Sequence, residues 1–371
     1  MPQPGRVLVV KLATLGDLLT ATPALRALRT TFPRAHIGVL ATPGSRDVLR
    51  GLDSVDEVIA FDKVAFDRPA ESVTRLPRAF GLARALRAGE WDVLVLLHHL
   101  TTPFGIAKYA ALCLASGAPR RVGLDNGRGG WFLTHAAADR GFGWRHEVDY
   151  WLDVVEVLGA RRPAAPRLEL MLTAEDAAWA DSQWPAVDAD VVLLGPGSGA
   201  FSVARRWPPR RFTELGRDLQ ATHGLRPVVL AGLGHDEQLL ARRVAEPLDA
   251  PVVPAAPTPQ ALAAFLRRCR LLVANDSGPV HLATAVGTPV VAIFGPSNDR
   301  AWGPYPPDDP RHQVAREQVV CAPCIHRGHS FGTPRGCAAR TCLAILEVDA
   351  VRAAADRALA AAERPEQIAV V

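Results

Sequence analysis

The stretch LLVANDSGPVHLATAVGTPVVAIF at residues 271–294 decides the fold class of this chain. It begins with a short apolar run, passes through the turn Asn275-Asp276-Ser277-Gly278 and a short helix-like segment, and ends in a second apolar run. Short apolar runs separated by a helix are typical of parallel strands that are buried on both faces. This stretch therefore predicts a βαβ unit of an α/β protein.

The same alternation extends along the rest of the chain. Strands are expected at residues 7–11, 37–41, 58–61, 93–97, 191–194, 227–231, 271–274 and 289–294. Helices are expected at residues 24–32, 82–88, 148–158, 210–224, 238–245, 258–268 and 279–285. Residues 100–145 carry a weaker pattern, and no internal sequence repeat is visible. This alternation of strands and helices predicts parallel sheets that are covered by helices on both faces.

Two α/β domains fit a chain of 371 residues with this pattern. The proline-rich segment at residues 160–166 is typical of a linker or a domain edge. We expect an N-terminal Rossmann-like domain at residues 1–180 and a C-terminal one at residues 181–350. Residues 351–371 would form a C-terminal helix and tail.

Composition and charge narrow the class of protein. Hydrophobic residues make up 49% of the chain and charged residues 22%, so extended disorder is excluded. The 42 basic and 38 acidic residues nearly balance, which argues against a dedicated nucleic-acid binder. No apolar run approaches the ~18–20 residues that cross a bilayer, and the N-terminal residues lead directly into a strand-like run. We therefore expect a cytoplasmic protein without an export signal.

The turn that follows residues 271–274 has the features of an anion site. Ser277 can cap the first N–H groups of the next helix, and Pro279 fits its first turn. The other N–H groups and the helix dipole would suit a diphosphate. Asp276 ends the strand, where ligands bind in open α/β sheets, and His281 could add a donor. An ordinary, well-capped strand–helix turn explains the same residues.

A second loop, GPGSGAFSVARR at residues 195–206, also follows an expected strand. Its three glycines allow the backbone to approach a ligand closely. Arg205 and Arg206 can meet phosphate oxygens with forked guanidinium groups. The loop is neither a P-loop nor a dinucleotide-binding fingerprint. The alternative is a flexible surface loop with a solvated arginine pair.

Asp17 follows the first expected strand, in the segment Thr14-Leu15-Gly16-Asp17. One interpretation is a capping box, in which the carboxylate accepts a hydrogen bond from the Thr14 amide. The other interpretation is a general base at the carboxyl end of a strand.

Four cysteines fall in two pairs that are about a dozen residues apart, with two histidines between them: Cys321, Cys324, Cys337 and Cys342. Such spacing is typical of a structural zinc site. His326 and His329 lie between the pairs and could substitute as ligands. The alternative is a set of reduced, packed or opportunistically oxidised thiols.

Together these motifs resemble glycosyltransferase family 9, the lipopolysaccharide heptosyltransferases. The resemblance lies in residues 7–28 (VLVVKLATLGDLLTATPALRAL), 195–215 and 275–305, and it spans essentially residues 6–350. It implies a GT-B fold, in which two Rossmann-like α/β domains face an interdomain cleft. The acceptor would bind the N-terminal domain, and the nucleotide sugar would bind the C-terminal domain.

The resemblance also implies roles for individual residues. Asp17 matches the general base of the family, and Arg205 stands where the family usually has a lysine. The implied donor-binding residues are Ser198, Arg205, Glu237, Thr258, Asp276, Ser277, Gly278 and His281. Arg121 and Arg128 are expected to bind an anionic acceptor, with a solvated face as the alternative. His98 and His99 stand on the acceptor side.

The implied reaction is an inverting, metal-independent transfer of a heptose or related sugar from an ADP-sugar to a hydroxyl of a lipopolysaccharide-core-type acceptor. No cofactor is expected for this step, and zinc at the four cysteines would be structural. The expected partners are the ADP-sugar and an anionic glycolipid or glycan, without nucleic acid. Peripheral contact with the inner face of the cytoplasmic membrane would follow.

Two alternatives stay open. One is a family 9 transferase that uses another nucleotide sugar or a soluble acceptor. The other is a non-catalytic protein that only binds a nucleotide sugar.

Overall fold

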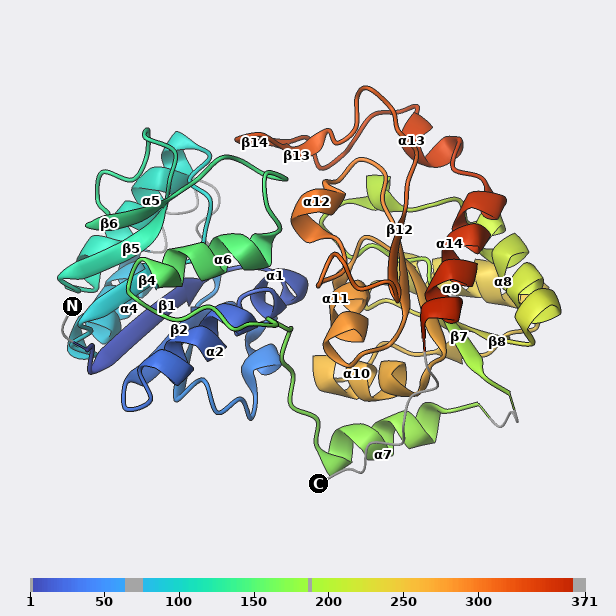
Figure 1. The fold of residues 1–371 in the computed structure, drawn as a ribbon, viewed down its shortest axis with the longest axis horizontal. Coiled ribbons are helices and arrows are strands. Elements are labelled where there is room, and N and C mark those ends of the chain that lie inside the picture. The colour runs from blue at the N-terminus through green and yellow to red at the C-terminus, as the bar shows by residue number, and fades with distance from the viewer. Residues whose placement is uncertain (1–2, 64–75, 186–188, 363–371) are drawn as a thin grey trace. The chain divides into compact units, whose positions relative to one another are not determined.

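A computed structural model describes residues 3–63, 76–185 and 189–362. The chain divides into two compact units, Met1–Glu169 and Leu170–Val371. In Figure 1 the first unit runs from blue to green, and the second from green to red. Each unit contains a six-stranded parallel sheet with helices packed on it. The predicted α/β class is confirmed.

The sheet of the first unit has the strand order β3-β2-β1-β4-β5-β6. Its strands are β1 (Arg6–Lys11), β2 (His36–Ala41), β3 (Glu57–Ala60), β4 (Val93–Leu96), β5 (Arg120–Asp125) and β6 (His135–Ala138). Its helices are α1 (Leu15–Leu19), α2 (Thr22–Thr31), α4 (Leu76–Ala88), α5 (Pro103–Ala115) and α6 (Glu147–Glu156), with a 3₁₀ turn at Arg46–Leu49. Leu86 of α4 and Cys113 of α5 are buried in one core cluster with Leu8 and Leu94 of the sheet. Helices α2 and α6 pack against each other.

The sheet of the second unit has the order β12-β11-β10-β7-β8-β9. Its strands are β7 (Val191–Gly195), β8 (Arg226–Leu230), β9 (Val252–Val253), β10 (Leu271–Asn275), β11 (Val290–Ile293) and β12 (His312–Ala315). Strands β13 (Ile325–Arg327) and β14 (Ser330–Gly332) form an antiparallel hairpin outside this sheet. Its α-helices are α7 (Ala174–Gln183), α8 (Pro209–His223), α9 (His235–Ala245), α10 (Pro259–Arg268), α11 (Gly278–Ala285), α12 (Asp299–Trp302), α13 (Thr341–Ala344) and α14 (Val348–Ala361). Short 3₁₀ turns occur at Val203–Arg205 and Glu246–Leu248. The core cluster joins buried side chains of α8, α9 and α14 to β7 and β10.

The two sheets have the same topology. In each, the first and fourth strands of the unit lie side by side, and the chain runs outward from them in opposite directions. These neighbours are β1 and β4 in the first unit and β7 and β10 in the second. In doubly wound sheets, ligands bind outside the carboxyl ends of the strands at this switch point. We therefore expect ligand-binding residues in the segments that follow these four strands.

Three details differ from the sequence prediction. The weakly patterned residues 100–145 contain α5, β5 and β6, and β12 follows the last strand that was expected. Residue 180, the predicted domain boundary, lies within α7, which packs on α10 of the second unit. The C-terminal helix begins at Val348 and packs on α8 and β12, so it is part of the second unit. Among the described residues, no helix combines the length and apolar character needed to cross a membrane.

Candidate functional site

The predicted phosphate loop and the turn after β10 begin next to each other. The strands β7 and β10 pair in parallel with Gly195 opposite Ala274, so residues 195–206 leave the sheet beside Asp276. The fully buried Asn275 ties the two segments together, because its Nδ2 donates a hydrogen bond of 2.7 Å to the Pro196 carbonyl. Both segments therefore lie at the switch point of the second unit.

Arg205 is oriented within this site by two hydrogen bonds. Its Nη1 lies 3.1 Å from Asp276 Oδ2, and its Nη2 donates to the Ser198 carbonyl at 2.6 Å. The ring of Phe201 lies 5.3 Å from the guanidinium carbon. The Nε of Arg205 is buried and has no hydrogen-bond partner among the described residues. A buried donor without an acceptor costs free energy, so a phosphate oxygen is the group that we expect to meet Nε.

The first turn of α11 differs from the prediction in its cap. The Ser277 hydroxyl donates to the Asn275 carbonyl at 2.8 Å and makes no hydrogen bond to the helix amides, so the predicted cap is wrong. The backbone at Ser277 is extended, as is usual for an N-cap residue, but its hydroxyl is engaged by the Asn275 carbonyl instead of the helix amides. The N–H groups at the start of this helix, near Gly278, are left to a ligand or to water. His281 is buried in the same helix.

Glu237 in the first turn of α9 fastens the glycine-rich loop. Its Oε1 accepts hydrogen bonds from the amides of Ser198 and Gly199, both at 2.8 Å, and from Arg206 Nη2 at 3.0 Å. A Cβ at Gly232 would collide with this carboxylate, so glycine allows the close approach. All three hydrogen bonds go to Oε1, and the ribose-binding role implied for Glu237 stays a prediction.

Thr258 has a structural role in this fold. Its hydroxyl accepts a hydrogen bond from the Ala261 amide at 3.0 Å as the N-cap of α10, and it donates to Asp176 Oδ1 at 3.1 Å. Its implied place beside the nucleotide base stays a prediction. The predicted donor residues that share one connected hydrogen-bond set are Ser198, Arg205, Glu237 and Asp276.

The position of Asp17 is compatible with both roles considered from the sequence, a capping box and a general base. Its Oδ2 accepts hydrogen bonds from the Thr14 hydroxyl at 2.7 Å and from the Thr14 amide at 3.3 Å, as in a capping box. The half-buried carboxylate also lies in α1, directly beyond the carboxyl end of the central strand β1. Capping does not exclude a catalytic role, because a hydrogen-bonded carboxylate can still accept a proton.

Lys11, the last residue of β1, was missed by the sequence analysis. It is only 3% exposed, and its Nζ lies 3.8 Å from the ring centroid of Trp151. Burial lowers the pKa of Lys11 to about 8, although the charges of Asp17 and Glu147 act to raise it. A lysine at the end of an otherwise apolar strand was the signal that could have identified this residue.

The two predicted acceptor-side histidines differ in charge. His99 is buried between two carboxylates, with Nδ1 2.9 Å from Asp139 Oδ2 and Nε2 3.1 Å from Glu147 Oε1. Burial acts to lower the pKa of His99, but these carboxylates outweigh it and raise the pKa to about 9. Burial and the charge of Lys11 hold the pKa of His98 well below its usual 6.5. His98 is therefore the neutral imidazole of the pair, and His99 has no free nitrogen for a substrate proton.

The two predicted acceptor arginines lie at opposite ends of β5. Arg121 is near the start of the strand, where Nε donates to the Phe132 carbonyl and Nη1 to the Ala118 carbonyl, each at 2.8 Å. These bonds give Arg121 a structural role, away from the carboxyl edge of the sheet. Arg128 is exposed on the loop after β5, at the same edge as Asp17. The structure therefore does not bring the two arginines together.

The model of the family described as glycosyltransferase family 9 (heptosyltransferase) matches residues 79–333, which is more than half of the chain. The chain belongs to glycosyltransferase family 9. Lipopolysaccharide heptosyltransferase 2 of Escherichia coli (strain K12) is 23% identical over 314 residues, which cover 79% of this chain and 83% of that protein. The solved structure of a family 9 glycosyl transferase from Veillonella parvula DSM 2008 is 25% identical with a TM-score of 0.73, covering 96% of this chain and 98% of that one. The structure of E. coli heptosyltransferase WaaC with ADP is 21% identical with a TM-score of 0.68, covering 95% and 99%.

These similarities confirm the GT-B fold class that the sequence predicted. They also confirm that this family 9 member is a glycosyltransferase, whose relatives are lipopolysaccharide heptosyltransferases. The sugar, the acceptor, the base and any metal requirement of this family 9 protein are matters for proposal.

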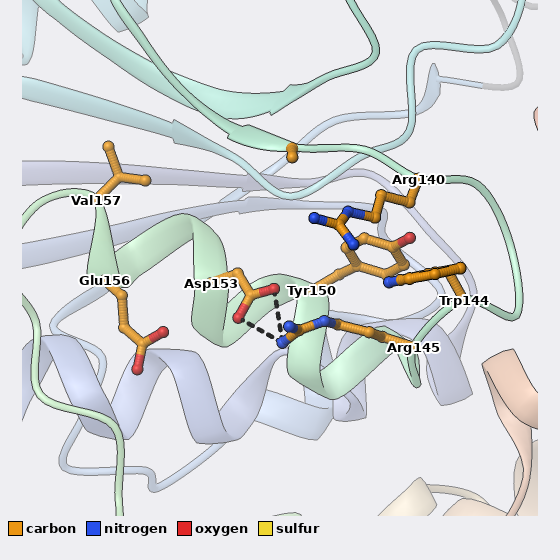
Figure 2. Close-up of a pocket in the computed structure, with 8 residues that line it drawn as sticks. Arg140, Trp144, Arg145, Tyr150, Asp153, Glu156 and Val157 are labelled. Carbon is orange, nitrogen blue, oxygen red and sulfur yellow. Dashed lines mark hydrogen bonds and ion pairs between the residues drawn. The ribbon is translucent and has the colours of Figure 1, made fainter.

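The first unit of this glycosyltransferase contains a cavity of about 410 Å³ between the end of β6 and α6. Figure 2 shows Arg140, Trp144, Arg145 and Tyr150 gathered toward one end of it, with Glu156 and Val157 toward the other. The residues that line it are Ala138, Arg140, Trp144, Arg145, Tyr150, Asp153, Glu156 and Val157. Neither the motifs nor the resemblance pointed to this cavity.

The four predicted metal ligands of the glycosyltransferase line one small cavity of about 20 Å³: Cys321, Cys324, Cys337 and Cys342. The Arg340 amide donates to Cys337 Sγ at 3.2 Å, and burial raises the pKa of the Cys324 and Cys342 thiols. In the described ranges, no three histidine, cysteine or acidic side chains are arranged to hold a metal ion. The zinc site therefore stays a prediction. Ala204, next to Arg205, lines the same cavity, so the cysteines adjoin the donor loop.

Proposed function

We propose that this glycosyltransferase transfers a heptose or a related sugar from an ADP-sugar to a hydroxyl of an anionic acceptor of the lipopolysaccharide-core type, with inversion. The observation that carries the proposal is the surroundings of Arg205. Its Nη atoms bind Asp276 and the glycine-rich loop, its buried Nε has no partner among the described residues, and Ser277 does not cap the helix that starts after Asp276. Such a combination suits the diphosphate of a nucleotide sugar.

The choice of ADP rests on similarity of fold. E. coli heptosyltransferase WaaC, whose structure has the same fold, was solved with ADP. The curated relatives are lipopolysaccharide heptosyltransferases. A family 9 transferase that uses a uracil or guanine nucleotide is the competing proposal.

The proposed chemistry is a direct displacement. The acceptor hydroxyl oxygen attacks the anomeric carbon while the bond from that carbon to the diphosphate breaks, and the Asp17 carboxylate takes the hydroxyl proton. The leaving electron pair goes to the diphosphate of ADP. Arg205 and the amides at the start of α11 would stabilise that charge, so no metal ion is invoked for this step.

The acceptor would bind the first unit at the carboxyl edge of its sheet. Arg128 lies at the same edge as Asp17, and its exposed positive charge supports an anionic acceptor there. Arg121 is no longer proposed for this role, because its guanidinium is bonded to backbone carbonyls. We place the enzyme in the cytoplasm, with peripheral contact to the membrane that carries a glycolipid acceptor.

A comparison of nucleotides by thermal shift tests the proposal. A ligand at about 100 times its Kd stabilises the folded protein by about 2.7 kcal/mol, which corresponds to several degrees in Tm. We expect the largest shift with ADP, and smaller shifts with UDP and GDP at equal concentration. Equal or larger shifts with UDP or GDP would favour another nucleotide sugar.

A further inference from the structure

The cavity between β6 and α6 has an exposed aromatic platform with a cation on it. Trp144 is 59% exposed, and the guanidinium of Arg140 lies 5.1 Å from its ring centroid. Figure 2 shows both side chains at the same end of the cavity as Tyr150, whose hydroxyl donates to the Gly141 carbonyl at 2.8 Å. Flat, exposed indole rings pack against the C–H faces of sugars, and guanidinium groups bind phosphate or carboxylate.

Three acidic side chains of α6 are paired with Arg162 and Arg145, and not with Arg140. Arg162 binds three carboxylates, with its nitrogens 3.0 Å from Asp149 Oδ1, 2.6 Å from Asp153 Oδ1 and 3.0 Å from Glu156 Oε1. Arg145 shares Asp153, at 3.1 Å. Arg162 and Arg145 together offset two of these three negative charges, whereas Arg140 forms no ion pair among the described residues.

The two ends of the cavity therefore carry side chains of opposite charge. Arg140 and Arg145 supply positive charge beside the indole, while Glu156 lies toward the other end (Figure 2). Its volume of about 410 Å³ falls within the ~300–1,000 Å³ range of small-molecule sites. Such a site can hold a sugar ring on the indole, an anionic substituent at the arginines and hydroxyl groups near the carboxylate.

The cavity also adjoins the buried His99 and its carboxylate partner Asp139. The ring of Tyr150 meets that of His99 edge to face, with centroids 5.0 Å apart. Asp139, which follows the cavity-lining Ala138, is bonded to His99 at 2.9 Å. Arg140 and Trp144 follow β6, so their end of the cavity lies at the carboxyl edge of the first sheet, the edge where Asp17 follows β1.

We propose that Trp144, Arg140 and Arg145 form a subsite for a saccharide unit that carries a phosphate or carboxylate group. The unit belongs to the acceptor, away from the hydroxyl that reacts. This subsite extends the proposed function, because it binds a second part of the anionic acceptor and takes no part in the chemical step.

Direct binding tests the subsite without requiring transfer. The full chain is saturated with ADP to occupy the donor site, and the Kd of glucose 6-phosphate is measured by titration, with glucose and inorganic phosphate as comparison probes. We expect glucose 6-phosphate to bind more tightly than either comparison probe. Arg140→Ala and Trp144→Ala should each raise its Kd, by about tenfold for the lost charge-assisted contact of Arg140.

Matched control variants show whether a change in Kd is specific to the subsite. Arg34→Ala removes an exposed arginine elsewhere in the first unit and should leave the Kd unchanged. Trp144→Phe keeps a flat ring and should retain more binding than Trp144→Ala. Asp17→Asn should bind the probe like the wild type, because Asp17 is outside the subsite, so a failure of the proposed base and a failure of the subsite give different results.

Three results would overturn the inference: no binding of glucose 6-phosphate to the wild type, equal binding of glucose or phosphate, or unchanged binding by the Arg140 and Trp144 variants.

Discussion

Arg205 makes hydrogen bonds through both terminal nitrogens while its Nε has no partner among the described residues. Removing the side chain would take away a charge-assisted contact to phosphate, which contributes about 1.5–3 kcal/mol. We therefore expect Arg205→Ala to weaken ADP binding by about tenfold or more and to lower turnover. Arg205→Lys should retain more of both, because the family usually has lysine here. Calorimetric titration with ADP measures the effect.

Arg210 provides a matched control for this prediction. It lies in the first turn of the neighbouring helix α8 with an exposed side chain, so Arg210→Ala should bind ADP like the wild type. If Arg205→Lys were as impaired as Arg205→Ala, the role carried over from the family lysine would be wrong.

The elements of the first unit are linked by the buried ion pairs of His99. This histidine follows β4, Asp139 follows β6, and Glu147 begins α6. Because the pKa of His99 is raised from 6.5 to about 9 in the folded protein, its contribution to stability is full below pH ~6.5 and is lost as the pH rises toward 9. We expect Tm to fall by a few degrees between pH 6.5 and 8, measured by calorimetry.

His99→Gln supplies the comparison, because glutamine cannot be protonated. Its Tm should change less than that of the wild type over the same interval. The interval ends at pH 8 because Lys11, with a lowered pKa of about 8, begins to titrate there and acts in the opposite direction. Equal slopes for the two proteins would show that His99 is not charged in the folded state.

The cysteine segment gives a second prediction at this scale. If the four thiols bind zinc, the purified protein should carry about one equivalent of metal that survives dialysis, because a four-cysteine site holds zinc tightly. Elemental analysis measures this, and Cys337→Ser should lower the metal content. Metal-free protein with an unchanged Tm would establish packed thiols instead. Because Ala204 lines this cavity, ADP affinity should be recorded on the same samples.

Element prediction succeeded where the apolar pattern was unambiguous. The continuous run at residues 271–274 became β10, and Gly224, which ends α8, has the positive φ of 66° that favours glycine. The pattern of helix α5 was weak in the sequence because its side chains are apolar on most sides, which hides the helical period. Ser277 is a residue type that often caps helices, but its hydroxyl instead donates to the Asn275 carbonyl, a contact that the sequence does not reveal.

At the scale of the whole molecule, two units with the same strand order arise from halves without visible sequence repetition. The order depends on apolar strand patterns and on right-handed crossovers, and neither requires identical residues. The sequence could therefore predict the architecture and the loops that follow β1, β7 and β10.

The site was predictable only in part. Residues that lie in continuous motifs, such as Asp17, Arg205 and Asp276, could be named from the sequence. Lys11 and Glu147 could not, because they are separated by more than a hundred positions, and only the tertiary fold lets the charge of Glu147 act on Lys11.

The proposed base and the proposed nucleotide site reside on different units. Asp17 lies in the first unit, and Arg205 and α11 lie in the second. A variant that removes the base should therefore affect the chemical step without affecting nucleotide binding. Asp17→Asn suits this purpose, because asparagine keeps the shape of aspartate and much of its capping ability.

The most direct test measures kcat, ADP affinity and Tm for Asp17→Asn beside the wild type, with an ADP-heptose donor and a lipopolysaccharide-core acceptor. Loss of a general base costs about 10²–10⁴ in rate, so we expect kcat to fall at least a hundredfold while ADP affinity and Tm barely change. A variant that melts early and loses ADP affinity together with activity would show that Asp17 acts only as a cap. Transfer at a near wild-type rate would contradict the account and make His98, the neutral histidine nearby, the next candidate base.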